Sequence, residues 1–197
     1  MAVRDTGTEQ LIKDTAKQVF FAEGKLHATT QDIADAAGIS RTSLHYYYRS
    51  RDALMKQVFN EGLEELSGKL YLLMGSGLPF KEKLEKMVGL FLTESIAYPY
   101  KEAFLVTEML SGVSNLYQIK KEHSPHIKAF LKEIEKEMDA GNITRTNPIQ
   151  FMMSMFALSS YPIMMGPLQK VMFNLSNEQH KRLMNERKKL IVDMLLK

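Results

Sequence analysis

Apolar residues recur every three or four positions along almost the whole chain of 197 residues, and this spacing constrains the fold more than any other feature. It places apolar side chains on one face of an α-helix, whereas a half-buried strand would alternate apolar and polar residues. No alternating stretch of useful length occurs in the sequence. We therefore expect an all-α protein, and a hydrophobic share of 45% is enough to build a buried core.

Capping residues, glycines and prolines divide the predicted helical chain into segments. In a capping box a hydroxyl residue precedes an acid or amide by three positions. Pairs with this spacing lie at three of the expected helix starts: Thr6 and Glu9, Thr29 and Asp32, Ser176 and Gln179. Gly24 is the expected stop of the first helix. We expect helices over residues 8–23, 29–37, 40–48, 51–75, 79–97, 102–110, 124–140, 148–161 and 176–197.

A short turn that contains a glycine, residues 37–40, joins the second and third predicted helices. Gly38 permits the positive φ that ends one helix, and Ser40 can cap the next. This is the arrangement of a helix-turn-helix motif. Leu44 and Tyr48 are expected to face the core, which turns a face of donors and aromatic rings outward: Arg41, Thr42, Ser43, His45, Tyr46 and Tyr47.

Charge supports this interpretation by its position and not by its total. The formal net charge of +3 fits nucleic-acid binding but also fits many other proteins. Residues 38–51, however, hold three arginines and no acid. Three arginines alone would indicate a solvated helix surface. Together with the glycine turn they favour a DNA-binding face.

The first quarter of the chain carries a spaced set of motifs: Phe20-x-x-x-Gly24, Thr29-x-x-x-Ile33-Ala34, Ala37-Gly38-Ile39-Ser40, Leu44-x-x-Tyr47-Tyr48 and Ser50-Arg51-Asp52-x-Leu54. This set resembles the DNA-binding domain of the TetR family of transcriptional regulators. The resemblance implies an N-terminal three-helix helix-turn-helix domain over residues 1–52. It also implies a C-terminal helical bundle for ligand binding and dimerisation over residues 53–197. A member of that family is expected to be a ligand-responsive repressor that binds palindromic, double-stranded operator DNA as a homodimer.

The resemblance also assigns residues to the DNA. It implies that Arg41, Thr42, His45 and Tyr46 meet bases in the major groove, with Ser43 on the same outward face. Phosphate contacts are implied for four further residues, which agrees with the preference of hydroxyls and cations for the backbone: Thr29, Ser40, Tyr47 and Arg51. Thr42 and His45 replace residues that are frequent in the family, so the operator sequence does not follow from a relative.

A ligand pocket is expected among the apolar and aromatic residues of the C-terminal helices. Flexible methionines suit an irregular core as well as an adaptable pocket, so any single methionine is better explained as core. The resemblance nevertheless implies a pocket, and the sequence provides these candidates: Tyr98, Phe104, Met109, Tyr117, Phe151, Met152 and Met155. Because they are apolar and aromatic, we expect a hydrophobic or aromatic effector.

An enzyme is the main alternative class, and the sequence offers it little. The chain has no cysteine, which excludes a disulfide framework and a thiol nucleophile. Phosphate-binding glycine loops, nucleophile elbows and HExxH patterns are absent from the sequence. His123 and His126 lie beside Glu122 at a helix start and are expected to face solvent. We expect no catalytic residue, metal or cofactor; an activator or a ligand-independent DNA-binding factor stays open.

Two apolar helices near the end of the chain predict self-association. Residues 148–161 are apolar nearly all round, and residues 176–197 carry an apolar stripe beside lysines and arginines. We expect a homodimer in which these helices form a four-helix interface. Since no apolar stretch is long enough to cross a bilayer and no signal-peptide core begins the chain, we expect a cytoplasmic protein without a membrane partner.

Overall fold

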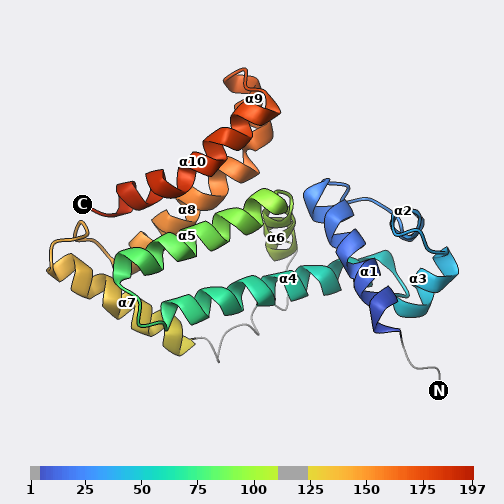
Figure 1. Ribbon diagram of the computed structural model, residues 1–197, viewed down its shortest axis with the longest axis horizontal. Coiled ribbons are helices and arrows are strands. Elements are labelled where there is room, and N and C mark those ends of the chain that lie inside the picture. The colour runs from blue at the N-terminus through green and yellow to red at the C-terminus, as the bar shows by residue number, and fades with distance from the viewer. Residues whose placement is uncertain (1–4, 111–123) are drawn as a thin grey trace.

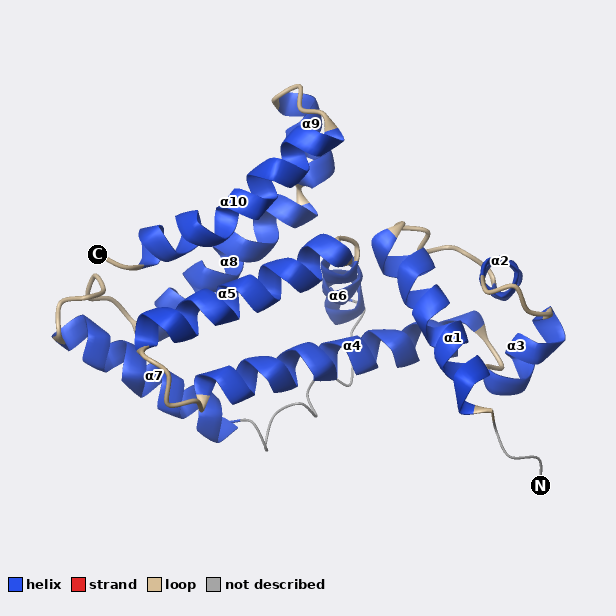
Figure 2. Ribbon diagram, in the orientation of Figure 1, coloured by secondary structure: helices blue, strands red, loops and turns tan. Residues whose placement is uncertain are grey.

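The computed structural model describes residues 5–110 and 124–197, and their regular structure is entirely helical (Figures 1 and 2). The elements are α1 Thr6–Lys17, η1 Gln18–Ala22, α2 Thr30–Ala36, α3 Arg41–Tyr47, α4 Arg51–Met74, α5 Phe80–Ala97, α6 Lys101–Leu110, α7 Ser124–Asp139, α8 Pro148–Met164, α9 Gly166–Met172 and α10 Asn177–Leu195. In Figure 1, α1 to α3 form a unit at one end, and the long α4 runs from it below α5 toward α7. The prediction of an all-α fold is confirmed.

The N-terminal unit has its own apolar cluster. Leu44 is fully buried in it and Tyr48 is nearly so, as predicted. The cluster does not end with the third helix, because it takes in α4 as far as Phe59 and also Phe104 of α6. The predicted boundary between residues 52 and 53 remains a prediction, and the packing on both sides of it is continuous.

The first helix begins and ends differently from the prediction. Its N-cap is Asp5 and not Thr6, because the Asp5 carboxylate accepts the backbone N–H of Gly7 at 3.0 Å and the hydroxyl of Thr8 at 2.6 Å. The last predicted turn is the π-helix η1, which buries Phe20 and Phe21 together. The chain then turns at Gly24, whose φ of +73° suits glycine.

The other predicted caps are present. The Thr29 and Asp32 pair forms a complete capping box before α2, and Ser176 and Gln179 do the same before α10. Gly38 has a φ of +67° at the end of the α2 segment, as the helix-turn-helix interpretation required.

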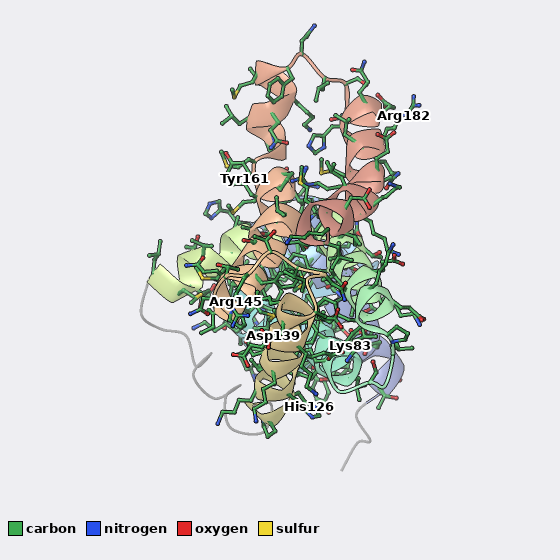
Figure 3. All side chains as sticks on the ribbon, turned by 90° about the vertical axis from the view of Figure 1, so that its left-hand side faces the viewer. Lys83, His126, Asp139, Arg145, Tyr161 and Arg182 are labelled. Carbon is green, nitrogen blue, oxygen red and sulfur yellow. The ribbon has the colours of Figure 1, made fainter. Side chains whose placement is uncertain are left out.

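The bundle core lies between the second half of α4 and helices α5, α7, α8 and α10. It contains one buried lysine, Lys83 of α5, which is visible in Figure 3. Its ammonium group pairs with Glu133 of α7 at 2.6 Å and donates to the carbonyl oxygen of Met74 at 3.3 Å. A buried charge is tolerated only when it is paired and hydrogen-bonded, and these contacts tie α5 to α7 and to the end of α4.

Helix α8 runs three residues beyond the predicted end at Tyr161. Pro162 lies inside its last turns, and the chain bends by 65° between α8 and α9. Gly166 and Pro167 open α9, where a proline without an N–H costs nothing. Within the described ranges, no single helix is long and apolar enough to span a membrane, although the bent α8 and α9 pair would pass that test by length and composition together.

The turn between α5 and α6 connects the bundle to the N-terminal unit. The Tyr100 N–H donates to the Phe21 carbonyl at 3.1 Å, and the Tyr100 ring lies directly against Gly24. Lys101 is buried and pairs with Glu94, which also lies 3.7 Å from Lys17. Burial lowers the pKa of Lys101 in spite of that pairing. The turn is thus fixed to η1 and α1 by backbone, ring and charge contacts.

This junction predicts a difference between two glycine variants. Gly24→Ala and Gly38→Ala both place a side chain at positive φ, which costs about 1–2 kcal/mol in each case. A Cβ at Gly24 would lie 2.7 Å from the Tyr100 ring, whereas a Cβ at Gly38 would meet nothing within 4 Å. Gly24→Ala should therefore lose more free energy of unfolding in urea titrations followed by circular dichroism. Equal losses would mean that the Tyr100 contact contributes nothing to stability.

Candidate nucleic-acid interface

Helix α3 is held by its inner face and by its N-cap. Leu44 and Tyr48 fix the helix in the N-terminal cluster. Ser40 adopts an extended backbone, and its hydroxyl accepts the Ser43 N–H at 3.1 Å. Since α2 packs against α3, the two short helices form one rigid element.

The outer face of α3 carries the residues assigned to DNA bases. Arg41, Thr42 and Tyr46 are exposed, while Ser43 and His45 are half-buried. No described carboxylate forms an ion pair with Arg41, and Tyr46 packs edge-on against Tyr47 with ring centroids 5.1 Å apart. The face therefore presents a guanidinium, hydroxyls and an imidazole, which are the groups that read base edges and bind phosphates.

Two of the residues assigned to phosphates lie at exposed helix starts. Thr29 and Ser40 are both exposed and both serve as N-caps. The Thr29 hydroxyl donates to the Asp32 carboxylate at 2.8 Å, and the Thr29 N–H donates to it at 2.7 Å. These bonds lower the pKa of Asp32, so the capping box stabilises the fold above the ordinary Asp pKa and weakens as the pH falls through the lowered value.

The other two assigned phosphate contacts also have partners within the protein. The Arg51 Nε donates to the Ala28 carbonyl at 3.0 Å, its Nη1 pairs with Asp52 at 2.5 Å, and its guanidinium lies over the Phe20 ring. The Tyr47 hydroxyl donates to the Asp5 carbonyl at 3.2 Å. Both side chains thus stabilise the N-terminal unit, and their contacts with DNA stay predictions.

The structure divides the residues predicted to bind a ligand. Phe151 and Met155 are buried in the bundle core, and Met152 packs against that core. Phe104 and Tyr98, in contrast, belong to the N-terminal cluster. Met109 is exposed, and Tyr117 lies outside the described residues. The structure thus brings the three α8 residues together and does not bring Tyr98 or Phe104 to them.

Of the two histidines considered as metal ligands, the structure describes only His126. His123 and Glu122 lie outside the described residues, and the His126 ring stacks on Tyr71 with centroids 6.5 Å apart. Over residues 5–110 and 124–197 no group of three or more His, Cys, Asp or Glu side chains is arranged to hold a metal ion.

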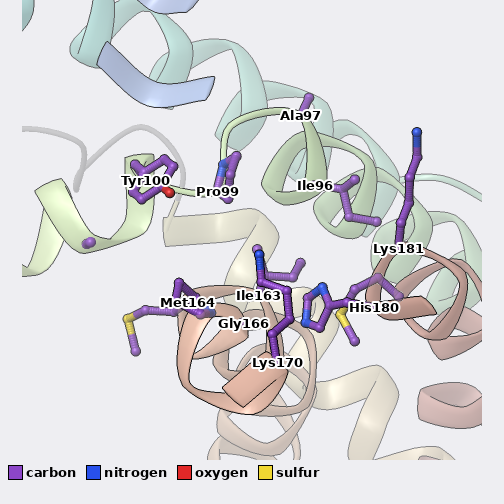
Figure 4. Close-up of a pocket in the computed structure, with 13 residues that line it drawn as sticks. Ile96, Ala97, Pro99, Tyr100, Ile163, Met164, Gly166, Lys170, His180 and Lys181 are labelled. Atoms are coloured by element: carbon purple, nitrogen blue, oxygen red, sulfur yellow. The ribbon is translucent and has the colours of Figure 1, made fainter. Parts of the chain in front are cut away.

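The sequence interpretation missed the junction at the α5–α6 turn and a cavity beside it. This cavity of about 470 Å³ lies between that turn, the α8–α9 bend and the start of α10 (Figure 4). Its residues come from five elements and follow no single helical period. Gly24 was the signal that the sequence offered for the junction. A glycine at the end of a helix permits another segment, here the turn with Tyr100, to pack closely against the backbone.

Comparison with known proteins identifies the N-terminal part. The sequence model of the family described as "Bacterial regulatory proteins, tetR family" matches residues 12–58, which run from α1 through α3 into α4. The helix-turn-helix region of this chain is thus similar to the DNA-binding region of that family. An HTH-type transcriptional repressor, KstR2 of Rhodococcus jostii, is 32% identical over 83 residues, 42% of this chain and 41% of that protein. KstR2 of Mycolicibacterium smegmatis is 33% identical over 101 residues, 50% of this chain and 48% of that protein.

A likeness of fold extends over the whole chain. The crystal structure of a TetR family transcription regulator from Marinobacter aquaeolei superposes with a TM-score of 0.61, covers 100% of this chain and 99% of that one, and is 16% identical. At this identity the likeness concerns the fold alone. The sequence matches to the two KstR2 proteins span less than half the length of each.

The N-cap of α3 predicts a difference between a matched pair of variants. Ser40→Ala removes the hydroxyl that accepts the Ser43 N–H and should cost about 1 kcal/mol of unfolding free energy. Ser43→Ala, three residues later, leaves that N–H and the cap in place and should change stability much less. Urea unfolding measures both. A loss in Ser43→Ala as large as that in Ser40→Ala would contradict the capping role.

Proposed function

We propose that this protein is a ligand-responsive transcriptional repressor that binds two-fold symmetric operator DNA as a homodimer. The observation that supports it most is the state of α3. The helix is capped by Ser40 and anchored by Leu44, yet its outer face leaves Arg41 and its neighbours to solvent. The naming of the two relatives as repressors supports repression, and the place of such a protein is the cytoplasm, where the DNA is.

The residues on this face divide into two roles. We assign recognition of the base sequence to Arg41 and His45, with Thr42 and Tyr46 in a supporting role. Side chains that reach the edges of bases distinguish one base pair from another. Positioning on the backbone falls to five residues whose groups bind phosphate oxygens: Thr29, Ser40, Ser43, Tyr47 and Arg51. Since Tyr47 and Arg51 also stabilise the N-terminal unit, their variants would disturb folding along with binding.

The proposed homodimer uses the apolar residues that α8, α9 and α10 leave exposed in one protomer. Scattered exposed apolar residues are normal, but a contiguous group marks an interface. The exposed members on these helices are Ile149, Met153, Tyr161, Met164, Leu168, Val171, Met172, Leu183, Leu190 and Met194. Ile191, which the sequence placed on the same stripe, is fully buried within the protomer. A two-fold pairing of α8 and α10 would form a four-helix interface.

The dimer proposal predicts an effect of charge at one exposed leucine. Leu190→Asp places a carboxylate in the interface and should turn the dimer into a folded monomer in light scattering. Leu72→Asp is the matched control, because Leu72 is equally apolar and 75% exposed on α4, away from these helices. It should remain a dimer. If the Leu190→Asp protein stays a folded dimer, the interface does not lie where we propose it.

Regulation is proposed to act through the connection of the bundle to the N-terminal unit. Helix α4 is continuous from Arg51 to Met74, so the bundle sets the direction of the helix that leads to α3. The α5–α6 turn holds the other side of the unit through Tyr100. A ligand that shifts these contacts changes operator affinity by as much as DNA changes ligand affinity, typically about 1–3 kcal/mol. The ligand contacts predicted from the sequence stay a prediction: Tyr98, Phe104, Met109, Tyr117, Phe151, Met152 and Met155.

DNA reading predicts a difference between two arginines of the same surface. Arg41→Ala should weaken binding to a selected operator by about 1–3 kcal/mol and change binding to random duplex much less. Arg49 is exposed just beyond the end of α3, where we expect its guanidinium to meet a phosphate. Arg49→Ala should therefore weaken binding to both duplexes by a similar factor and flatten the salt dependence. Fluorescence anisotropy at several salt concentrations measures this. Equal losses on both duplexes for both variants would remove the division of roles.

A further inference from the structure

We infer that the cavity between the α5–α6 turn, the α8–α9 bend and α10 binds a small molecule with an apolar body and a carboxylate group. The inference rests on the proposed function only for its regulatory consequence, because binding itself can be measured without DNA. Its volume of about 470 Å³ lies within the range of about 300–1,000 Å³ that is usual for ligand pockets.

Most of the cavity wall is apolar. Ile96 and Pro99 line it from the end of α5 and the turn after it, Ile163 and Met164 from α8, and Met184 from α10. Figure 4 shows these walls converging around an open centre from segments far apart in the sequence. Such a surface binds an apolar body by removing it from water.

The charged residues of the lining are Lys170 of α9 and Lys181 of α10, which lie beside the His180 imidazole, and no acid lines the cavity. Lys170 donates to the neutral Asn177 side chain at 2.9 Å, so its charge is not cancelled by that contact. In the part of the chain that the structure describes, neither lysine forms an ion pair. A ligand that enters this site is stabilised by an anionic group.

His180 marks where that group would bind. Its Nε2 is fully buried and has no hydrogen-bond partner among the described residues. The ring packs against Gly166, where an added Cβ would lie 3.0 Å from the ring carbon Cε1. A buried polar nitrogen without a partner is costly, and a carboxylate oxygen that accepts its N–H would remove that cost.

The cavity shares a wall with the junction that holds the DNA-binding unit. Pro99 and Tyr100 line it, and the same Tyr100 donates to the Phe21 carbonyl and lies against Gly24. A molecule that fills the cavity therefore presses on the contact between the bundle and η1. Occupancy and the orientation of the N-terminal unit are coupled through this one turn.

Methyl NMR of the full-length protein tests the binding directly. Met164 and Met184 line the cavity, whereas the buried Met138 on α7 does not, so ¹³C-methyl methionine labelling reports on the site and on a control outside it. The probes are decanoate and its neutral counterpart decan-1-ol, below their aggregation concentrations. We expect saturable shifts at Met164 and Met184 but not at Met138. Decanoate should bind about tenfold or more tightly than decanol, although the alcohol is the more apolar molecule.

Three variants locate the anionic group. His180→Leu and Lys170→Met should each weaken decanoate binding by about tenfold and leave decanol binding nearly unchanged. Lys170→Met is included because it keeps the His180 packing at the α8–α9 bend intact. Lys188→Met, an exposed lysine of the same helix α10 outside this cavity, should change neither affinity. The inference is overturned if decanoate does not shift Met164 and Met184, if decanol binds equally well, or if neither His180→Leu nor Lys170→Met weakens decanoate.

Operator titrations separate this site from the proposed regulation. If decanoate binds as described and lowers operator affinity, both the site and the ligand switch are supported. If it binds without changing operator affinity, the site stands and the regulatory role of the cavity is wrong. A protein that binds decanoate but no duplex DNA would contradict the proposed function while leaving the carboxylate site in place.

Discussion

The packing of three phenylalanines joins the two halves of this protein, and the rest of the structure depends on it. Phe21 of η1, Phe59 of α4 and Phe104 of α6 meet with ring centroids 4.9 to 6.1 Å apart. Aromatic pairs at such distances contribute about 0.5–1.5 kcal/mol beyond their buried area. Because the rings come from the N-terminal unit, the connecting helix and the bundle, the unit that carries α3 is not free to rotate on a flexible linker.

This constraint explains how a distant site and α3 can be coupled. The bundle holds α4 through Leu70 and Met74 and holds η1 through the α5–α6 turn. The two connections support the unit from different sides, so a shift in one of them tilts α3. The charged groups around the turn contribute as well: Glu102 accepts the Ser95 hydroxyl at 2.5 Å, and burial raises the pKa of Glu102. A packed and partly buried junction of this kind shifts between discrete arrangements more readily than it deforms continuously.

Local signals in the sequence predicted the fold well, because helix ends are decided by a few neighbouring residues. Thr29, Asp32 and Ser40 act within three positions of their partners, and their caps are present as expected. Asp5 was missed as the first N-cap because Thr6 and Glu9, one position later, match the capping-box pattern, whereas Asp5 and Thr8 do not. The end of α8 was placed too early because a proline in the last turns of a helix does not always end it.

Long-range packing was beyond the sequence. Tyr98 and Phe104 have aromatic side chains of the kind that line pockets, but they pack at the junction with the N-terminal unit. The type of a side chain does not say which of two cores it enters. The cavity with His180 escaped notice because its members lie on five elements, and only the fold brings Pro99, Gly166 and His180 together. The exposed face of α3 was accessible to prediction because its residues are consecutive on one short helix, and its contacts with DNA stay a prediction.

Selection of bound sequences from random duplex DNA tests the central claim most directly, because DNA reading and pairing of protomers both leave their mark on the selected site. Two recognition helices in a dimer fit successive major grooves about 34–36 Å apart. If the protein binds DNA as a homodimer, we expect a two-fold symmetric site whose half-sites are centred about one helical turn, 10–10.5 bp, or a multiple of it apart. Failure to enrich any sequence, or enrichment of a single unpaired half-site, would contradict it.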